Sequence, residues 1–270
     1  SCLHGYNVSI IAFGQTGSGK THTMRGGKDH LEGIIPRAVK FIFEQAKSLE
    51  QIGWKFEFSI ALPEIYNDEA FDLLNKRSKV DLKLTGQELT TVGLTSRSIK
   101  APRELSSILA EADAARKTAA TKCNEFSSRS HMVFQLNVKA TNEEQASTQK
   151  SCLKLVDLAG SERAKESGAE GDRFKEMTFI NKSLACLQNC VRMQREKKAH
   201  VPYRDSKLTM LLRDCLGGGN SKTMVIVNLN PLDSQSNETK RSIEFATRMR
   251  TTKIGVALKD ADSLADRASL

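Results

Sequence analysis

Apolar and polar positions follow two different periods along the chain. Some apolar runs are short and rich in β-branched residues, while others alternate with polar residues, and both patterns predict strands. Pro63 interrupts one alternating segment, which is therefore predicted to lie at a sheet edge or to contain a bulge. Buried strands are predicted at residues 8–13, 152–158 and 223–229, and alternating strands at 54–66 and 131–140.

Elsewhere apolar residues recur every three or four positions, which places them on one face of a helix. The clearest such stripe runs from Ile35 to Leu49. The remaining segments are polar or short in period, and they predict turns, small strands and a loop. Longer helices are predicted at residues 35–49, 102–115, 174–192 and 238–252, short helices at 21–24, 68–74 and 206–215, small strands at 79–100 and a polar loop at 142–150.

The predicted strands alternate with the predicted helices along most of the chain. This order is typical of an α/β fold in which helices cover both faces of one sheet. We therefore expect a three-layer sandwich, with a central mixed, mostly parallel sheet flanked by helices.

A glycine-rich segment follows the first predicted strand and reads Gly14-Gln15-Thr16-Gly17-Ser18-Gly19-Lys20-Thr21. Backbone N–H groups can surround phosphates only where Cβ atoms do not block them, so glycines at the bends favour a phosphate-binding loop. In such a loop Lys20 reaches the β- and γ-phosphates and the Thr21 hydroxyl binds Mg²⁺. The alternative is a glycine-rich turn that precedes a lysine by chance, which four fixed positions make about a once-in-30,000 match.

Two further segments carry polar side chains that suit phosphate chemistry. Asp157 ends the apolar strand at 152–158, where its carboxylate could contact the water shell of a metal, and Gly160 follows it. The alternative is an ordinary strand-end aspartate that caps a helix. The cluster Asn124-Glu125-Phe126-Ser127-Ser128-Arg129-Ser130-His131 offers hydroxyls for a metal and an arginine for a carboxylate, although in isolation a serine-rich loop is the favoured interpretation.

The composition indicates which partners and which cellular compartment suit the chain, but it does not identify a reaction. The 270 residues include 41 Lys and Arg against 32 Asp and Glu, and the net charge of +9 suits an acidic partner such as nucleic acid, an anionic membrane or an acidic protein. The six cysteines form no CxxC pair, so we expect reduced thiols. No apolar run is long enough to span a bilayer and no secretory signal is visible, so a soluble, intracellular chain is expected.

Together the three polar segments resemble the kinesin motor domain, in the order and context of that family. The resemblance runs from about Gly5 to Arg250. It implies the P-loop NTPase fold of kinesins. Further matches are Ile180-Asn181-Lys182-Ser183-Leu184, the run from His200 to Thr209, and Leu216-Gly217-Gly218.

The resemblance implies ATP and Mg²⁺ as ligands and gives a role to each matching residue. The nucleotide cradle and its neighbours would be Gln15, Thr16, Gly17, Ser18, Gly19, Lys20, Thr21 and His22. The first switch would be Asn124, Ser127, Ser128, Arg129 and Ser130, and the second would begin with Asp157, Gly160 and Glu162. Mg²⁺ would be held, partly through water, by Thr21, Ser128 and Asp157, and the catalytic groups would be Ser128, Arg129, Gly160 and Glu162.

The resemblance also implies how the site would change with its nucleotide. Arg129 would pair with Glu162 when the γ-phosphate is bound, which would exclude solvent and hold a water in line for attack. Loss of that phosphate would release both loops.

The same family resemblance implies a track. Five basic residues would meet the acidic surface of tubulin, a contact that should weaken with salt. Without the resemblance, a solvated basic face would be the better reading. The five residues are Arg163, Lys182, His200, Arg204 and Lys207.

Three functions are weighed on this basis. The leading hypothesis is a microtubule-stimulated ATPase that moves along microtubules in the cytoplasm, including the spindle. The alternative is a kinesin-like module that grips microtubules without productive hydrolysis. A P-loop NTPase acting on nucleic acid fits the charge but not the two switch segments, so neither nucleic acid nor membrane is expected as a partner.

Several features depart from the family pattern or extend it. The family's first strand, first helix and adenine-contacting segment precede the phosphate loop and are not seen here, so residues 1–252 are expected to form an N-terminally incomplete motor domain, with a tail at 253–270. Phe126 replaces a residue that is usually polar and is predicted to pack against its neighbours. Residues 53–56 and 253–257 resemble minus-end-directed kinesins with a C-terminal motor, and dimerisation is expected through a stalk outside this chain.

Overall fold

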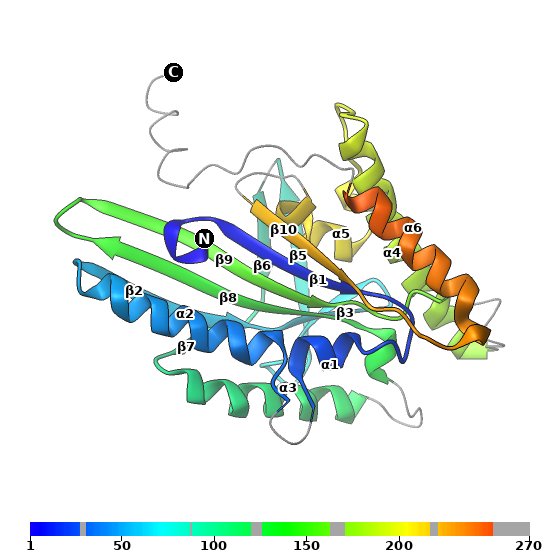
Figure 1. Cartoon of the computed structure of the whole chain (residues 1–270), viewed down its shortest axis with the longest axis horizontal. Helices are drawn as coiled ribbons and strands as arrows, with labels where there is room; N and C mark the ends of the chain where they lie inside the picture. The colour runs from blue at the N-terminus through cyan, green and yellow to red at the C-terminus, as the bar shows by residue number, and fades with distance from the viewer. Residues whose placement is uncertain (28–30, 87, 120–125, 163–170, 217–220, 251–270) are drawn as a thin grey trace.

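The computed structural model describes residues 1–27, 31–86, 88–119, 126–162, 171–216 and 221–250 (Figure 1). The predicted tail at 253–270 and the side chain of Phe126 therefore lie outside the described residues. None of the helices in these ranges combines the length and apolar character that a membrane crossing needs. The cysteines within them, at positions 2, 152, 186, 190 and 215, are free thiols.

One twisted sheet forms the centre of the molecule (Figure 1). Its strands follow the order β10-β1-β9-β8-β3-β4-β5-β6, while β2 pairs with β8 and β7. The strands are β1 (Asn7–Phe13), β2 (Trp54–Ala61), β3 (Pro63–Tyr66), β4 (Glu69–Asp72), β5 (Ser78–Thr85), β6 (Glu88–Val92), β7 (Arg97–Ile99), β8 (His131–Asn142), β9 (Ser147–Asp157) and β10 (Ser221–Val227).

The sheet is mixed, as the sequence predicts, but the expectation that it is mostly parallel is wrong. Within the described residues β1 runs parallel to β10 and β9, and the other strand pairs are antiparallel. The reason is the connections: short turns join β3 to β4 and β8 to β9, and a short turn can join only antiparallel neighbours.

Helices cover both faces of the sheet, which confirms the predicted three layers (Figure 1). One core lies between the sheet and the first three helices, and the other lies between the sheet and the last three. The helices are α1 (Lys20–Arg25), α2 (Ile34–Glu50), α3 (Leu105–Ala119), α4 (Gly171–Arg195), α5 (Lys207–Leu211) and α6 (Ser236–Arg250).

The short helix predicted at 68–74 is absent, because those residues belong to the hairpin of β3 and β4. Asn67 and Asp68 form its turn with φ values of +51° and +59°. Asparagine and aspartate tolerate this left-handed conformation, which two-residue hairpin turns require. The sequence pattern missed it because the turn carries no glycine.

Other boundaries shift for local reasons. The polar loop predicted at 142–150 shrinks to residues 143–146, since β8 and β9 continue their pairing to Asn142 and Ser147. The segment at 54–66 breaks at Leu62, before Pro63, and the helix at 206–215 ends at Leu211. Strand β10 is only half-buried, because it lies at one end of the sheet order rather than in the middle.

The aromatic rings of Phe13 and Phe245 join the end of β1 to α6. They stack with centroids 3.9 Å apart, and both side chains are buried. We expect Phe245→Ala to lower the free energy of unfolding by about 3 kcal/mol, through lost apolar burial and the cavity left behind. Urea unfolding measures this change. Ile243→Ala on the same helix is the control, because Ile243 is 49% exposed and should change stability by less than about 0.5 kcal/mol. Equal losses would contradict a stabilising role for the stack.

Candidate active site

The loop after β1 bends at three glycines with positive φ, a conformation that other residues rarely adopt. Gly14 has φ +151°, and a Cβ there would lie 2.3 Å from the carbonyl oxygen of Asn228. Gly17 has φ +77° and faces open space, and Gly19, with φ +95°, is the N-cap of α1. The tip of the loop at Gly17 is thus open to an anion.

Lys20 begins α1 and is buried against the loop. Its ammonium group donates a hydrogen bond to the carbonyl oxygen of Gln15 over 2.9 Å. Burial lowers the pKa of Lys20, while the nearby charges of Asp157 and Glu162 oppose that shift. The loop therefore holds a cation whose positive charge is only partly compensated, as an anionic ligand would require.

Thr21 and Asp157 meet beside this cation. The Thr21 hydroxyl donates to Oδ2 of Asp157 over 2.7 Å, which joins α1 to the end of β9. Burial raises the pKa of Asp157, and the Thr21 hydrogen bond and the charge of Lys20 lower it again. Two of the three predicted Mg²⁺ ligands thus lie in direct contact.

Several buried polar atoms around the loop have no hydrogen-bond partner within the described residues. Buried polar groups are normally paired, so a cluster of unpaired ones indicates space for a ligand or its water shell. Oxygen atoms are the ligands that Mg²⁺ prefers, and the residues present therefore fit a phosphate chain with its hydrated metal. The unpaired atoms are Gln15 Oε1, Ser18 Oγ, Asp157 Oδ1, Ser161 Oγ and Asn228 Oδ1.

Gly160 is the point where three loops approach each other. Its backbone N–H donates to the carbonyl oxygen of Ser128 over 2.9 Å. A Cβ at Gly160 would lie 2.3 Å from both Thr16 Oγ1 and Glu162 Oε2, so a larger residue would have to displace these side chains. Glu162 itself accepts from the backbone N–H of Thr16 over 2.8 Å and from its hydroxyl over 2.5 Å. The structure thus brings together predicted members of the cradle and of both switches.

Arg129 and Glu162 are both described, and they do not pair in this structure. Arg129 Nη1 instead donates to Glu176 Oε2 on α4 over 2.7 Å. Tyr66 donates to the other oxygen of Glu176 over 2.5 Å, and burial followed by this hydrogen bond raises the pKa of Tyr66 to about 12. The Arg129 to Glu162 pair was expected for the nucleoside triphosphate state, and it stays a prediction for that state.

The other predicted nucleotide residues have different positions. Ser130 is buried, and its hydroxyl donates to Glu64 of β3 rather than to the glycine loop. His22 is exposed on α1. Asn124 and the side chain of Ser127 lie outside the described residues.

Some residues at the site were not found from the sequence. Asn228 follows β10, donates to Thr23 of α1 over 2.9 Å and presses its carbonyl oxygen against Gly14. Gln15 Nε2 donates to Gln235 Oε1 over 3.0 Å, in the 3₁₀ turn Asp233–Gln235 before α6. The position of Asn228 directly after an apolar strand is a signal of the kind that identified Asp157. This signal could not place Asn228 at the glycine loop, because the sequence does not show that β10 lies next to β1.

Four of the five predicted track-facing residues lie on α4, on α5 and on the connection between them. Lys182 on α4 and the backbone N–H of Lys207 on α5 both reach Asp68, at 3.6 Å and 2.8 Å. Arg204 is exposed and donates to the carbonyl oxygen of Leu84 on β5, and His200 is exposed. These four residues lie on neighbouring elements, whereas Arg163 lies outside the described residues.

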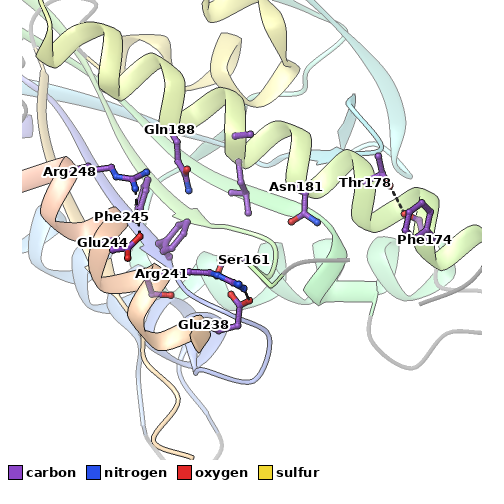
Figure 2. Close-up of a pocket in the computed structure, with 14 residues that line it drawn as sticks. Ser161, Phe174, Thr178, Asn181, Gln188, Glu238, Arg241, Glu244, Phe245 and Arg248 are labelled. Carbon is purple, nitrogen blue, oxygen red and sulfur yellow. Dashed lines mark hydrogen bonds and ion pairs between the residues drawn. The ribbon is translucent and has the colours of Figure 1, made fainter. Parts of the chain in front are cut away.

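A cavity of about 580 Å³ separates α4 from α6 (Figure 2). Phe245 and Arg248 line it from α6, and Asn181 and Gln188 line it from α4 (Figure 2). Ser161, directly after Gly160, lies at its edge. The second switch segment thus borders both the glycine loop and the space between these two helices.

The fold and this loop geometry define a P-loop nucleotide-binding domain. The chain matches the family described as Kinesin motor domain over residues 1–252. It belongs to the kinesin motor domain family.

The similar proteins include kinesin-like proteins of a fungus and a plant and a solved C-terminal motor. It is 45% identical to Kinesin-like protein klpA of Emericella nidulans over 96% of this chain and 34% of the relative, and 43% identical to Kinesin-like protein KIN-14N of Oryza sativa over 95% and 35%. A solved structure of the C-terminal motor and motor homology domain of Kar3Vik1, fused to a synthetic heterodimeric coiled coil, matches with a TM-score of 0.81 and 38% identity, over 92% of this chain and 65% of that one. The chain spans about a third of the length of these curated relatives.

His131 connects the first switch segment to the second and to α4. Its Nδ1 accepts from the backbone N–H of Ala159 over 3.0 Å, so its Nε2 carries the proton and donates to Ser183 over 2.8 Å. Complete burial and the charge of Lys20 lower the pKa of His131 to about 3. The neutral imidazole is therefore the folded form.

This tautomer predicts a dependence of stability on pH. The folded pKa lies below the unfolded one, so stability is complete above about pH 6.5 and is lost as pH falls, at up to about 1.4 kcal/mol per pH unit. We expect His131→Asn to flatten the loss of unfolding free energy between about pH 6 and pH 4, as measured by urea titration. His200→Asn at the exposed site is the control and should keep the wild-type slope. An unchanged slope in His131→Asn would refute the assignment.

Proposed function

We propose that this chain is the motor domain of an ATPase that moves along microtubules. The observation that carries the proposal is the contact of three loops, in which Gly160 reaches Ser128 while Glu162 bonds to Thr16 of the glycine loop. A terminal phosphate placed between these loops would be sensed by both switches at once. Membership of the kinesin motor domain family supports ATP as the nucleotide and the microtubule as the track.

The glycine loop and Lys20 would hold the phosphates of ATP. Thr21, Ser128 and Asp157 would hold Mg²⁺, with Asp157 acting partly through water. When bound, Mg²⁺ supplies charge neutralisation to the phosphate oxygens during transfer of the γ-phosphoryl group to water. Further nucleotide contacts are proposed for His22, Asn124 and Ser127.

Catalysis would then depend on positioning more than on covalent chemistry. In this proposal the Gly160 N–H and Ser128 would orient the γ-phosphate and its attacking water. Glu162 is already fixed by Thr16, and Arg129 lies one residue beyond Ser128. Closing an Arg129 to Glu162 pair would exclude bulk water from the transfer.

Nucleotide state would reach the track through α4. Arg129 of the first switch bonds to Glu176 of this helix, and Lys182 lies two turns further along the same helix. A change in the partner of Arg129 would therefore act on the element that carries a track-facing lysine. The proposed tubulin contacts are Arg163, Lys182, His200, Arg204 and Lys207.

The location, the oligomeric state and the direction of movement are proposed from the likeness to kinesins. The motor would act in the cytoplasm on the microtubule cytoskeleton, including the spindle, and would dimerise through a stalk outside this chain. Movement toward the minus end is proposed because residues 53–56 and 253–257 resemble kinesins with a C-terminal motor. Gliding of polarity-marked microtubules over the surface-bound full-length protein determines the direction.

Removing the buried cation of the loop tests the enzymatic part. We expect Lys20→Ala to lower the microtubule-stimulated kcat of the full-length protein at least about 100-fold, because no other described cation contacts the loop carbonyl of Gln15. Steady-state ATPase assays with polymerised tubulin measure this. Lys47→Ala, on the exposed face of α2, is the matched control and should keep wild-type turnover. A wild-type protein that binds microtubules without stimulated hydrolysis would instead favour a binding module.

Removing charge from the track-facing surface tests the partner. We expect Lys182→Ala and Lys207→Ala each to weaken microtubule affinity about two- to fivefold, since exposed ion pairs contribute modestly, and the loss should shrink as salt rises. Co-sedimentation with microtubules at two salt concentrations measures both effects. Lys139→Ala lies on β8, away from α4 and α5, and should bind like the wild type. Equal affinity for all three variants would place the track elsewhere.

A further inference from the structure

Glu64 is a fully buried carboxylate on β3 that the nucleotide site does not use directly. Its Oε2 accepts from Arg77 Nε over 2.7 Å, and its Oε1 accepts from Arg116 Nε over 3.0 Å and from the Ser130 hydroxyl over 2.7 Å. A buried charge without such partners would be strongly unfavourable, so this network holds its members in fixed positions.

Two of these partners flank the first switch. Arg116 lies near the end of α3, before the segment, and Ser130 follows the 3₁₀ turn Phe126–Arg129 directly. Both bond to the same oxygen of Glu64, and Arg116 Nη2 also donates to the Ser130 hydroxyl over 2.9 Å. The chain enters and leaves the switch at one closed triangle of hydrogen bonds.

The triangle of Glu64, Arg116 and Ser130 is next in sequence to residues that make contacts at the candidate active site. Ser128, two residues before Ser130, accepts from the backbone N–H of Gly160. Arg129, the residue between them, bonds to Glu176 of α4. A shift of Ser130 would therefore move the Ser128 carbonyl against Gly160, and a displacement of about 1 Å can lower a rate about 100-fold.

We propose that Glu64 is a positioning residue for ATP hydrolysis, which anchors both ends of the first switch through Arg116 and Ser130. It touches neither phosphate nor metal and acts through Ser128. This inference rests on the proposed ATPase function. It also gives Ser130 a different role from direct nucleotide contact.

Arg77 provides an internal comparison. It bonds to the other oxygen of Glu64 and packs over the rings of Phe71 and Tyr66, at 4.2 Å and 5.2 Å. It comes from the connection between β4 and β5, outside the switch. Weakening it disturbs the same buried carboxylate without releasing either end of the switch.

The experiment compares Ser130→Ala and Glu64→Gln with Arg77→Lys in the full-length protein. For each, the melting temperature and the kcat and KM for ATP are measured without microtubules. We expect the first two variants to lose about tenfold or more in kcat with KM changed less than about threefold, because the loop that binds phosphate is untouched. Arg77→Lys should keep kcat near the wild-type value even where its melting temperature falls as far as that of Ser130→Ala.

Each outcome decides for or against the inference. A kcat that follows the melting temperature across all three variants would reduce Glu64 to a structural role and overturn it. A loss in Ser130→Ala alone would mean that Ser130 contacts the nucleotide itself, which also overturns it. Should Glu64→Gln not fold, the KM for ATP decides for Ser130→Ala: a lower kcat at unchanged KM, with kcat kept in Arg77→Lys, supports the positioning role, whereas a raised KM indicates nucleotide contact and overturns the inference. If the wild type hydrolyses no ATP, the proposed function fails first, and that result is distinguishable because it precedes any comparison of variants.

Discussion

The site depends on the close approach of the glycine loop to the second switch at Gly160. A Cβ there would lie 2.3 Å from side-chain oxygens of Thr16 and Glu162, so a larger residue would displace these two hydrogen-bonded side chains. The sheet makes the meeting possible. Because β1 runs parallel to β9 and β10, and β8 runs antiparallel to β9, the ends of three strands and the start of the fourth share one edge. Ligand sites of α/β folds lie at such edges.

The edge that holds the glycine loop carries charges of both signs close together. Lys20 is buried beside Asp157 and Glu162, so removing any one of them would leave a charge in a poorly solvated site. The unpaired oxygens of Asp157 and Ser161 mark where the protein itself does not complete the hydrogen bonding. A site of this kind gains stability when its ligand binds, since the ligand supplies partners that the folded chain lacks.

Local sequence predicted those parts of the site whose determinants are local. The glycine loop, the strand before it and Asp157 at the end of β9 are each encoded within a few residues. Glu64 and Glu176 could not be predicted this way, because their partners Ser130 and Arg129 lie 66 and 47 residues away. The prediction of a mostly parallel sheet was wrong for a related reason. Alternation of helices and strands predicts layers, but the turn at 143–146 decides that β8 and β9 run antiparallel.

Arg129 joins the first switch to α4 in this structure. Its Nη1 donates to Glu176 on α4, while Glu162 accepts two hydrogen bonds from Thr16 of the glycine loop. Glu176 also accepts from Tyr66 of β3, so one carboxylate contacts the switch and the sheet from the helix that carries it. A shift of Arg129 that breaks its hydrogen bond to Glu176 would therefore act on the helix that carries Lys182.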